Sequence, residues 1–473
     1  MKNRMVISLL FMGLVLISGC ASASIKVGLK QINNLVMDQA GVSDLNQLSE
    51  ADAQKEIQLI LQEPLTVDSA VRIAVLNNPF LKAAMARLGI SQADMVQAGL
   101  LHNPKFSGFI RKSNEEDRKN NTEFEVKQDV MDLLFWPLRK RLANAQFKQA
   151  EYELAKTIVD FIEKVRIGFY TWQASTHMLS MRQEHFKAEE AALELAERQK
   201  QAGNINTLDL EQQKGIYYQA QTDLQRSKLE TNIAAQQLRN LLGLTNSELQ
   251  WLSQENLPDL PSEEFSLTEL EKKALANRIE LTMKRQEIKA FEQSLTMARL
   301  GVIPSVEGGY NWEKETDGER LKGPTIESEV PVFDHKQADR LRAKSQIEAG
   351  KRQLEALEAQ ICLEVRLAYG QLASNKVMTE TYMKAIPVHR EILKQTLYHY
   401  NYMLKGVYDL LRAKQEEINT ERDYITALRD YWIARSELEH AIGMTLPIEK
   451  SEIKIIEKST EPVMRHEHHG GVK

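Results

Sequence analysis

The fold is decided by residues 139–201, which read RKRLANAQFKQAEYELAKTIVDFIEKVRIGFYTWQASTHMLSMRQEHFKAEEAALELAERQKQ. The stretch has no proline and one glycine, Gly168. Its apolar residues recur every three or four positions, and a subset recurs every seven, as in a coiled-coil seam. The seam positions are Ile158, Val165, Trp172, Leu179, Phe186 and Leu193. One helix of this length would measure about 95 Å, whereas globular helices average about 11 to 12 residues. The stretch therefore predicts one arm of a rod-like hairpin rather than an ordinary core helix.

The rod occurs twice in the chain. A shift of 200 positions superposes residues 66–243 on residues 266–443, and similar residues then meet. Matching pairs include Ala74 with Ala274, Asn77 with Asn277, Pro104 with Pro304, Val165 with Val365, Arg166 with Arg366 and Gly243 with Gly443. We therefore predict two internal repeats, each with a helix, two strands and a long antiparallel helical hairpin. An irregular linker at 244–265 would join them.

Each repeat is expected to open with one helix of about 35 residues. In the first repeat Asn78-Pro79 interrupts this helix, and we expect a kink there. The helical hairpins are predicted at 139–242 and 339–442. Their turns are expected at 202–207 and, in a tighter form, at 405–407 around Gly406.

Between the opening helix and the rod, both repeats change to alternation of apolar and polar residues, which indicates strands. The predicted strands are 104–112, 122–131, 303–313 and 324–332, with Gly308, Tyr310 and Trp312 on one face. Each has about the 9 to 11 residues of a tilted transmembrane strand, although two surface hairpins would show the same pattern. Four strands cannot close a barrel, and a sheet in lipid tolerates no free edge. We therefore predict a mainly α fold with a membrane β-barrel, in which a homotrimer builds twelve strands on an α-helical tunnel.

The chain begins with the features of an export signal: Lys2 and Arg4, an apolar run at 5–17, and then small residues. Residues 17–20, Ile-Ser-Gly-Cys, resemble the lipobox of bacterial lipoproteins, whose cysteine becomes the lipid-bearing first residue. We predict a signal peptide at 1–19 and lipidation at Cys20, with an ordinary cut after residues 21–23 as the alternative. Residues 20–65 would then form a lipid-anchored N-terminal segment. Ala21, rather than an aspartate, follows the cysteine, and in the bacterial lipoproteins that this site resembles, such a residue permits transport to the outer membrane.

Composition argues against several functional classes. The chain has 42% hydrophobic and 27% charged residues, a net charge of -5 and no basic patch interleaved with aromatics, so nucleic acid is not an expected partner. Its two cysteines are too few for a disulfide framework. The sequence contains no nucleophile motif, no phosphate-binding glycine loop and no cluster of metal ligands, so we expect neither an enzyme nor a cofactor. A polar tail at 444–473 holds His466, His468 and His469, which either bind copper, zinc or nickel or form a solvated chain end.

The order of several short motifs resembles the TolC-like family of outer-membrane efflux proteins over nearly all of residues 66–443. The motifs are AVLNNPFL at 74–81, Asn103-Pro104, Leu208-Asp209-Leu210 after Gly203, Leu242-Gly243, Ile303-Pro304 and Val330-Pro331-Val332-Phe333. The resemblance implies a trimeric exit duct of a tripartite efflux pump, with a periplasmic helical tunnel and neither catalytic residues nor cofactor. The implied partners are a periplasmic adaptor that meets the hairpin tips, an inner-membrane pump and outer-membrane lipid.

A further resemblance bears on the cargo. Residues 400–411, YNYMLKGVYDLL, resemble the second hairpin tip of family members that export heavy-metal cations. Passive export of small solutes, with heavy-metal cations as the candidate cargo, is therefore the leading interpretation. A type I protein secretion duct and a periplasmic coiled-coil adaptor or scaffold lipoprotein are the alternatives. Adaptors usually flank one hairpin with β-rich domains, whereas this chain predicts two hairpins and two strand pairs.

The resemblance also implies functional residues at the hairpin ends. Family members close at the periplasmic end, where the second hairpin carries two aspartates three residues apart into the lumen. Asp409 matches the first position, Arg412 departs from the pattern at the second, and Glu416 shares their helical face. We predict a gate at these three residues; alternatively, Asp409 complements the helix start. The predicted adaptor-contact residues are Gly203, Asn204, Thr207, Asp209, Gly406, Val407 and Tyr408.

Overall fold

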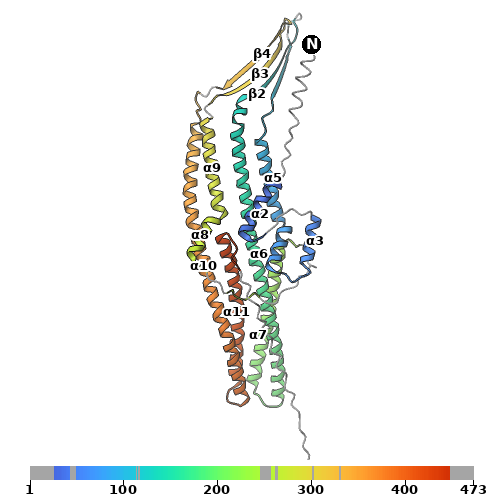
Figure 1. Cartoon of the computed structure of the whole chain (residues 1–473). Helices are drawn as coiled ribbons and strands as arrows, with labels where there is room; N and C mark the ends of the chain where they lie inside the picture. The colour runs from blue at the N-terminus through green and yellow to red at the C-terminus, as the bar shows by residue number, and fades with distance from the viewer. Residues whose placement is uncertain are drawn as a thin grey trace, which may run out of the picture.

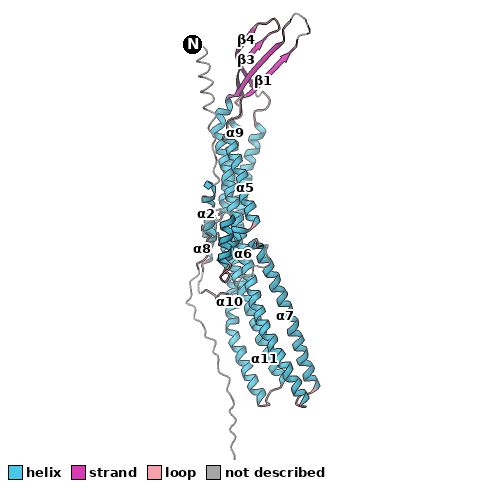
Figure 2. Cartoon of the chain, turned by 90° about the vertical axis from the view of Figure 1, so that its right-hand side faces the viewer, coloured by secondary structure: helices cyan, strands magenta, loops and turns pink. Residues whose placement is uncertain are grey.

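The chain forms a long bundle of helices that ends in a small sheet (Figure 1). The computed structural model describes residues 26–42, 50–112, 114, 118–244, 257–261, 265–300, 303–329 and 332–447. The predicted signal peptide, Cys20 and the tail histidines lie outside the described residues. The sheet occupies one end of the molecule and the turns of both helical hairpins occupy the other (Figure 2). The mainly helical character of the predicted fold, with a small sheet, is confirmed, whereas the membrane barrel and the homotrimer stay predictions.

The elements follow the same order in both halves of the chain, after two N-terminal helices, α2 (Lys26–Ala40) and α3 (Glu50–Ile60). The first half contains α4 (Val67–Asn77), α5 (Pro79–Ala98), β1 (Lys105–Arg111), β2 (Asn121–Asp129), α6 (Val130–Gln201) and α7 (Thr207–Leu242). The second half contains α8 (Leu267–Asn277), α9 (Ile279–Leu300), β3 (Ser305–Lys314), β4 (Arg320–Glu329), α10 (Gln337–Asn401) and α11 (Val407–Ile442). Each half thus holds two short helices, two strands and one long helical hairpin.

The first rod is longer than its predicted range. Helix α6 has 72 residues, begins at Val130 and includes Pro137, whereas the predicted range began at Arg139. A proline removes one backbone hydrogen bond and bends a helix without always ending it. The start is fixed instead by Asp129, whose carboxylate accepts from the backbone N–H groups of Met131 at 2.8 Å and Asp132 at 3.1 Å.

The predicted seam of this rod is fully buried along half of its length. Ile158, Val165 and Trp172 are at most 5% exposed, because α2, α4 and α11 also pack against this part of α6. The remaining positions, from Leu179 to Leu193, are half-buried. Near the hairpin turn fewer helices surround α6 (Figure 2), so the same heptad pattern buries less surface there.

The helix that opens the first half is broken rather than kinked. Asn78 ends α4 and caps α5, its side-chain oxygen accepting from the backbone N–H of Phe80 at 2.8 Å. The amide nitrogens of Asn77 and Asn78 donate to four backbone carbonyls at the end of α7, over 2.7 to 3.2 Å. Gly243 ends α7 with φ 68°, and a Cβ there would lie 2.9 Å from the Cα of Asn78. The AVLNNPFL motif therefore fastens the start of this half to the end of its hairpin.

The second half breaks at the corresponding place without a proline. Arg278 separates α8 from α9, and its guanidinium donates to the carbonyl of Ala441 at the end of α11 over 3.2 Å. The same group pairs with Glu280 at 2.9 Å and Glu364 at 3.1 Å. The prediction of one continuous helix here was wrong, because an arginine inside a helical pattern gives no signal of a break.

The four strands form one antiparallel sheet in the order β1-β2-β3-β4. Strands β2 and β3 pair across the two halves of the chain, with Phe124 opposite Trp312. β2 ends at Asp129, earlier than predicted, because α6 begins at the next residue; β4 begins at Arg320, earlier than the predicted 324, because the turn at 315–319 is tight. Within the described part of the chain, the outer edges of β1 and β4 have no partner strand.

The core lies at mid-length, where the two halves meet. Leu242, Leu438 and Ile442 are fully buried there. Helix α2 packs on α6, and the guanidinium of Arg166 donates to the carbonyl of Ala40 over 2.8 Å, so part of the segment expected at 20–65 contributes to the core. Among the described residues, no helix combines the length and the apolar character that crossing a membrane requires.

Candidate functional site

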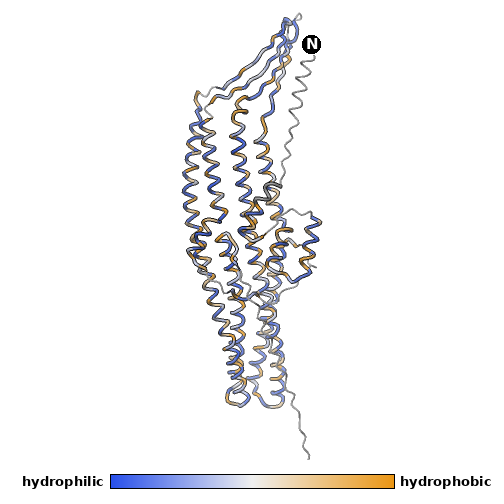
Figure 3. The backbone as a smooth tube through the Cα atoms, in the orientation of Figure 1, coloured by the Kyte–Doolittle hydropathy of each residue, from blue (hydrophilic) through white to orange (hydrophobic). Residues whose placement is uncertain are grey.

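The sheet gathers all of its acidic side chains on one face and most of its large apolar side chains on the other, with Phe109 and Leu321 as exceptions on the acidic face. Apolar and polar positions alternate along the strands (Figure 3), and residues paired in register share a face. One face, the acidic face, holds all seven acidic residues of the strands: Glu123, Glu125, Asp129, Glu307, Glu313, Glu327 and Glu329. The opposite face, the apolar face, holds Phe106, Ile110, Phe124, Val126, Tyr310, Trp312 and Ile326. The predicted common face of Gly308, Tyr310 and Trp312 is confirmed by the register.

Hydrogen bonds cross the acidic face and tie the four strands together. The donors and acceptors are Lys105 to Glu307 at 2.6 Å, Lys127 to Glu327 at 2.7 Å, Asn121 to Glu313 at 2.7 Å, Asn311 to Glu123 at 2.8 Å and Thr325 to Glu125 at 3.0 Å. Three basic residues, Lys105, Arg111 and Lys127, stand against the seven acidic ones on this face. The face is therefore cross-linked by hydrogen bonds and carries an excess of negative charge.

The apolar face is exposed within a single chain. The rings of Phe106, Phe124 and Trp312 stack in a row across three strands, with centroids 6.0 and 5.8 Å apart. Phe106 is 69% exposed and Ile326 is 80% exposed. A contiguous apolar surface of this kind marks contact with a membrane or another protein.

The hairpin turns lie at the opposite end of the molecule (Figure 2). The loops are 202–206 and 402–406, so the second turn is not tighter than the first, contrary to prediction. Gly203 takes the left-handed conformation in the first loop (φ 77°), and Met403 takes it in the second (φ 60°). We expected Gly406 to make the second turn, but its φ is -86° and it precedes the first residue of α11. Composition misleads here because a methionine holds the position that usually favours glycine.

The predicted tip and gate residues all lie at this end. The tip residues are Gly203, Asn204, Thr207, Asp209, Gly406, Val407 and Tyr408. The carboxylate of Asp409 accepts from the backbone N–H of Gly406 at 3.2 Å, so this residue caps α11. Arg412 and Glu416 are exposed on the same helix. No ion pair joins Asp409 to Arg412 within the described ranges, and the carboxylate serves the helix start instead.

A side-chain hydrogen bond joins the two hairpin tips. The hydroxyl of Tyr408 donates to Oδ1 of Asp209 over 2.9 Å. This bond, followed by partial burial, raises the pKa of Tyr408, so the hydroxyl keeps its proton and remains a donor. The sequence marks both residues as tip residues but not their contact, because residues 199 positions apart meet only once the two hairpins are placed side by side.

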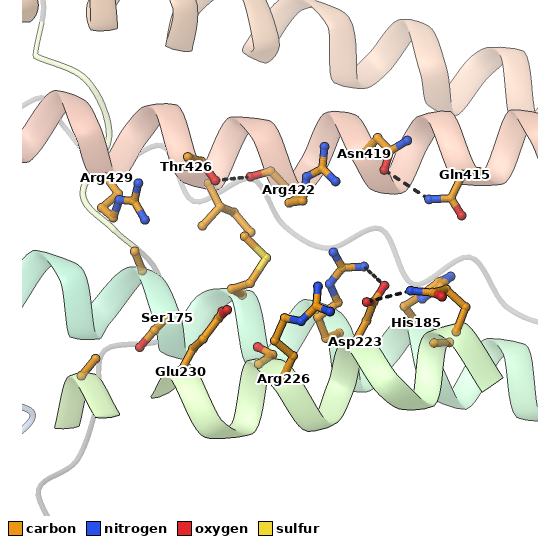
Figure 4. A pocket seen from close by; sticks show the side chains of 18 of the residues that line it. Ser175, His185, Asp223, Arg226, Glu230, Gln415, Asn419, Arg422, Thr426 and Arg429 are labelled. Atoms are coloured by element: carbon orange, nitrogen blue, oxygen red, sulfur yellow. Dashed lines mark hydrogen bonds and ion pairs between the residues drawn. The ribbon is translucent and has the colours of Figure 1, made fainter. Parts of the chain in front are cut away.

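A cavity of about 810 Å³ lies between the hairpins, bounded by α6, α7 and α11 (Figure 4). Its charged lining residues are Arg182, Arg226, Arg422, Arg429, Asp223 and Glu230. Arg182 pairs with Asp223 at 3.5 Å. Sequence reasoning missed this cavity, although Arg422 and Arg429, like Asp223 and Glu230, are spaced by seven and so share a helical face. The lining is polar, which suits water and ions better than an apolar ligand.

Metal-ligand geometry is not found in the described part of the chain: no group of three or more His, Cys, Asp or Glu side chains there could hold a metal ion. His440, which the sequence left without a role, bridges α11 to Asp160 at 2.9 Å and Glu163 at 3.6 Å on α6. The predicted ligands of the tail, His466, His468 and His469, lie outside the described residues.

The first half of the chain, with its two opening helices, its two strands and its long hairpin, matches a known family model. Residues 70–244 match the family model described as "Outer membrane efflux protein". The resemblance to the TolC-like outer-membrane efflux family is thereby confirmed. Among individual proteins, the chain is similar to the cobalt-zinc-cadmium resistance protein CzcC of Cupriavidus metallidurans, at 19% identity over 388 residues, which cover 80% of this chain and 90% of the relative.

Solved structures of channels share the fold. The crystal structure of CusC, reported for its transmembrane channel formation, gives a TM-score of 0.66 at 16% identity, covering 80% of this chain and 91% of that chain. The outer-membrane channel OprN gives a TM-score of 0.67 at 15% identity, covering 85% of this chain and 94% of that chain. At these identities the likeness establishes the fold.

Proposed function

We propose that this chain is the outer-membrane exit duct of a tripartite efflux pump. Three copies close a 12-stranded barrel in the membrane, and their hairpins form a tunnel in the periplasm that meets an adaptor and an inner-membrane pump. The observation that carries the proposal is the sheet, which has one acidic face, one exposed apolar face and two edges without a partner strand. Backbone groups at an open edge in hydrocarbon would each cost several kcal/mol, so β1 and β4 pair with neighbouring copies.

The two faces of the sheet set its orientation in the barrel. Membrane barrels turn apolar residues toward lipid and polar residues toward the lumen. The stacked rings of Phe106, Phe124 and Trp312 then contact lipid. The acidic face lines the lumen, and three copies multiply its excess of carboxylates threefold.

The cargo is proposed to be a heavy-metal cation. A lumen lined by charges of one sign focuses the field and concentrates the opposite sign, so the acidic face favours cations over anions. The similarity to the cobalt-zinc-cadmium resistance protein supports the same cargo class. The histidines of the tail, His466, His468 and His469, would add a collecting site, and removing residues 465–473 should then lower metal tolerance.

The cargo is tested in cells and in bilayers. Deleting the gene should lower tolerance to zinc, cobalt or copper. Unchanged metal tolerance with raised drug sensitivity would indicate a drug as cargo, and loss of a secreted protein would indicate a protein as cargo. In planar bilayers under a KCl gradient, Glu125→Gln should reduce cation selectivity. Glu50→Gln on α3, which lies away from the sheet (Figure 1), is the matched control and should leave the reversal potential unchanged. Equal cation selectivity of the wild type, Glu125→Gln and Glu50→Gln would refute an acidic lumen.

The hairpin tips are proposed to form the periplasmic gate and the adaptor contact. The bond from Tyr408 to Asp209 holds the two hairpins of one chain together, as a closed end requires. Asp409, Arg412 and Glu416 would face the narrowed lumen, with Asp409 also capping its helix. The second tip is apolar and exposed, with Met403 at 94% and Leu404 at 70%, and such a surface fits a helical partner that covers it.

The gate is tested by removing single groups. Tyr408→Phe deletes only the hydroxyl and should raise the open probability of the channel in planar bilayers. Tyr402→Phe, an exposed tyrosine at the same tip, is the control and should behave as wild type. Asp409→Ala and Arg412→Ala should each change conductance or cation selectivity. If neither does while Tyr408→Phe opens the channel, Asp409 is a helix cap only and the hairpin bond is the gate.

A further inference from the structure

The apolar face of the sheet ends in a cluster of basic side chains. Lys314 and Arg320 are paired directly in register on this face, where β3 meets β4 at the end of the sheet farthest from the helices. Lys322 lies on the same face, paired with Trp312. We call Lys314, Arg320 and Lys322 the basic rim. Like charges directly opposite each other destabilise an antiparallel pair, so this arrangement needs an explanation.

No acidic side chain of the strands shares a face with the basic rim. All seven acidic residues of the strands lie on the other face. Glu315 and Glu319, in the adjoining turn, continue the alternation toward that other face, since the backbone N–H of Glu315 still donates to the carbonyl of Glu319 at 2.9 Å. Among the described residues, none forms an ion pair with a member of the rim.

The basic residues of the acidic face behave differently. Lys105 reaches Glu307 at 2.6 Å, and Lys127 reaches Glu327 at 2.7 Å. Among the described residues, the bases on the face proposed for the lumen are paired and those on the face proposed for lipid are not. This difference points to a partner of the rim on the lipid side.

We propose that the basic rim binds the phosphate groups of anionic lipid headgroups in the outer leaflet around the channel. This inference rests on the proposed function, because it needs the apolar face to lie in lipid. At about 3.3 Å per residue along a strand, Trp312 and Tyr310 lie roughly 7 and 13 Å below Lys314. Aromatic residues favour the level where hydrocarbon meets headgroups, which puts the rim at the height of the phosphates.

The chemistry of the rim suits a phosphate. The planar guanidinium of Arg320 can bind two phosphate oxygens at once, and the two lysines add mobile point charges. Their aliphatic stems can lie along the apolar face while the charged ends reach upward. A phosphate between Lys314 and Arg320 would also relieve the repulsion within the pair.

The test uses the full-length trimer and a lipid probe with a matched blank. Purified protein in neutral phosphatidylcholine nanodiscs is titrated with diphosphorylated lipid A and with the same lipid after phosphatase treatment, and bound lipid is counted by native mass spectrometry. Lys314→Gln/Arg320→Gln/Lys322→Gln should bind the phosphorylated lipid at least about tenfold more weakly than wild type. Lys272→Gln/Lys273→Gln/Lys289→Gln, which removes three exposed charges from α8 and α9, should bind it as wild type does.

The outcomes separate this inference from the channel proposal. Equal binding by wild type and the rim variant, or equal binding of both lipid forms, overturns the inference while the channel still inserts and conducts in phosphatidylcholine bilayers. Displacement of the lipid by millimolar inorganic phosphate would show a free-anion site instead and also overturn it. If the wild-type protein inserts into no bilayer, both proposals fail.

Discussion

Replacing Gly243 with alanine tests whether Asn77 and Asn78 fasten the start of the first repeat to its end. We call the hydrogen bonds from these two amides to the end of α7 the asparagine clamp. Gly243 has φ 68° and faces Asn77 and Asn78, whose amides hold the end of α7. Gly203, at the first hairpin turn, has a similar φ of 77° but no heavy atom within 4 Å of a built Cβ. Both substitutions, Gly243→Ala and Gly203→Ala, therefore place alanine in a left-handed conformation, but only the first brings its Cβ against Asn77 and Asn78.

The magnitudes follow from these two environments. A left-handed conformation costs a residue with a Cβ about 1 to 2 kcal/mol, and this is the whole expected loss for Gly203→Ala. In Gly243→Ala the new Cβ would lie 2.9 Å from the Cα of Asn78 and 3.0 Å from the carbonyl oxygen of Asn77, so backbone must move. Losing two of the four amide hydrogen bonds at about 1 kcal/mol each brings the expected loss for Gly243→Ala to about 3 to 4 kcal/mol.

The measurement is the unfolding midpoint of the detergent-solubilised protein, followed by circular dichroism. Gly243→Ala should lower the midpoint most and Gly203→Ala least. Gly443→Ala should fall between them, because its Cβ would lie 3.4 Å from the nearest atoms, the backbone nitrogen of Arg278 and Nε2 of Gln39. Equal shifts for Gly243→Ala and Gly203→Ala would refute the clamp and leave only the cost of the backbone conformation.

Three further changes probe buried carboxylates and the lipid anchor. Burial raises the pKa of Glu151 to about 7, compared with 4.5 in the unfolded chain. Ionised Glu151 therefore destabilises the folded protein as the pH rises above 4.5. In denaturant titrations, Glu151→Gln should stabilise the protein by about 2 kcal/mol at pH 8 and not at pH 4. Burial also acts to raise the pKa of Asp132, but hydrogen bonds from His102 and Arg139 lower it to about 2. Its stabilisation is present above pH 4 and is lost toward pH 2, so Asp132→Asn should lose about 2 kcal/mol at pH 7 and little at pH 2; an equal loss at both would contradict this. Cys20→Ser should abolish incorporation of radiolabelled palmitate, and equal labelling of both proteins would remove the proposed lipid anchor.

Local sequence patterns were enough to predict the long helices and the strand regions. Heptads mark α6, and alternation marks β2 and β3, because each pattern depends on residues within a few positions of one another. The break at Arg278 escaped prediction since its cause is distant: the guanidinium reaches the carbonyl of Ala441 at the far end of the repeat. The early start of α6 also escaped prediction, because the helix begins at an N-cap on Asp129, upstream of the proline-free stretch that marks the rod.

The candidate site divides in the same way. The sequence marks Asp209 and Tyr408 as tip residues but leaves out the hydrogen bond between them, which depends on how two rods lie together. The sequence also does not reveal that all acidic residues of the sheet share one face. Alternation shows which residues of a single strand share a face, but the pairing of β2 with β3 is not visible in the sequence. Where a residue breaks a common rule, as Met403 does in its left-handed turn, only coordinates reveal the position.

The pairing of β2 with β3 also sets an order in which the sheet can fold. Lys314 and Arg320 pair across one short turn, whereas Phe124 and Trp312 pair only after the whole first hairpin lies between them. Closing so long a loop loses chain entropy before any contact compensates it, so the two outer ribbons form early and the seam between them forms late. Until then each ribbon has two open edges and an uncovered apolar face, the combination that promotes aggregation. The nascent chain is therefore most vulnerable to aggregation after its rods have folded and before β2 has paired with β3.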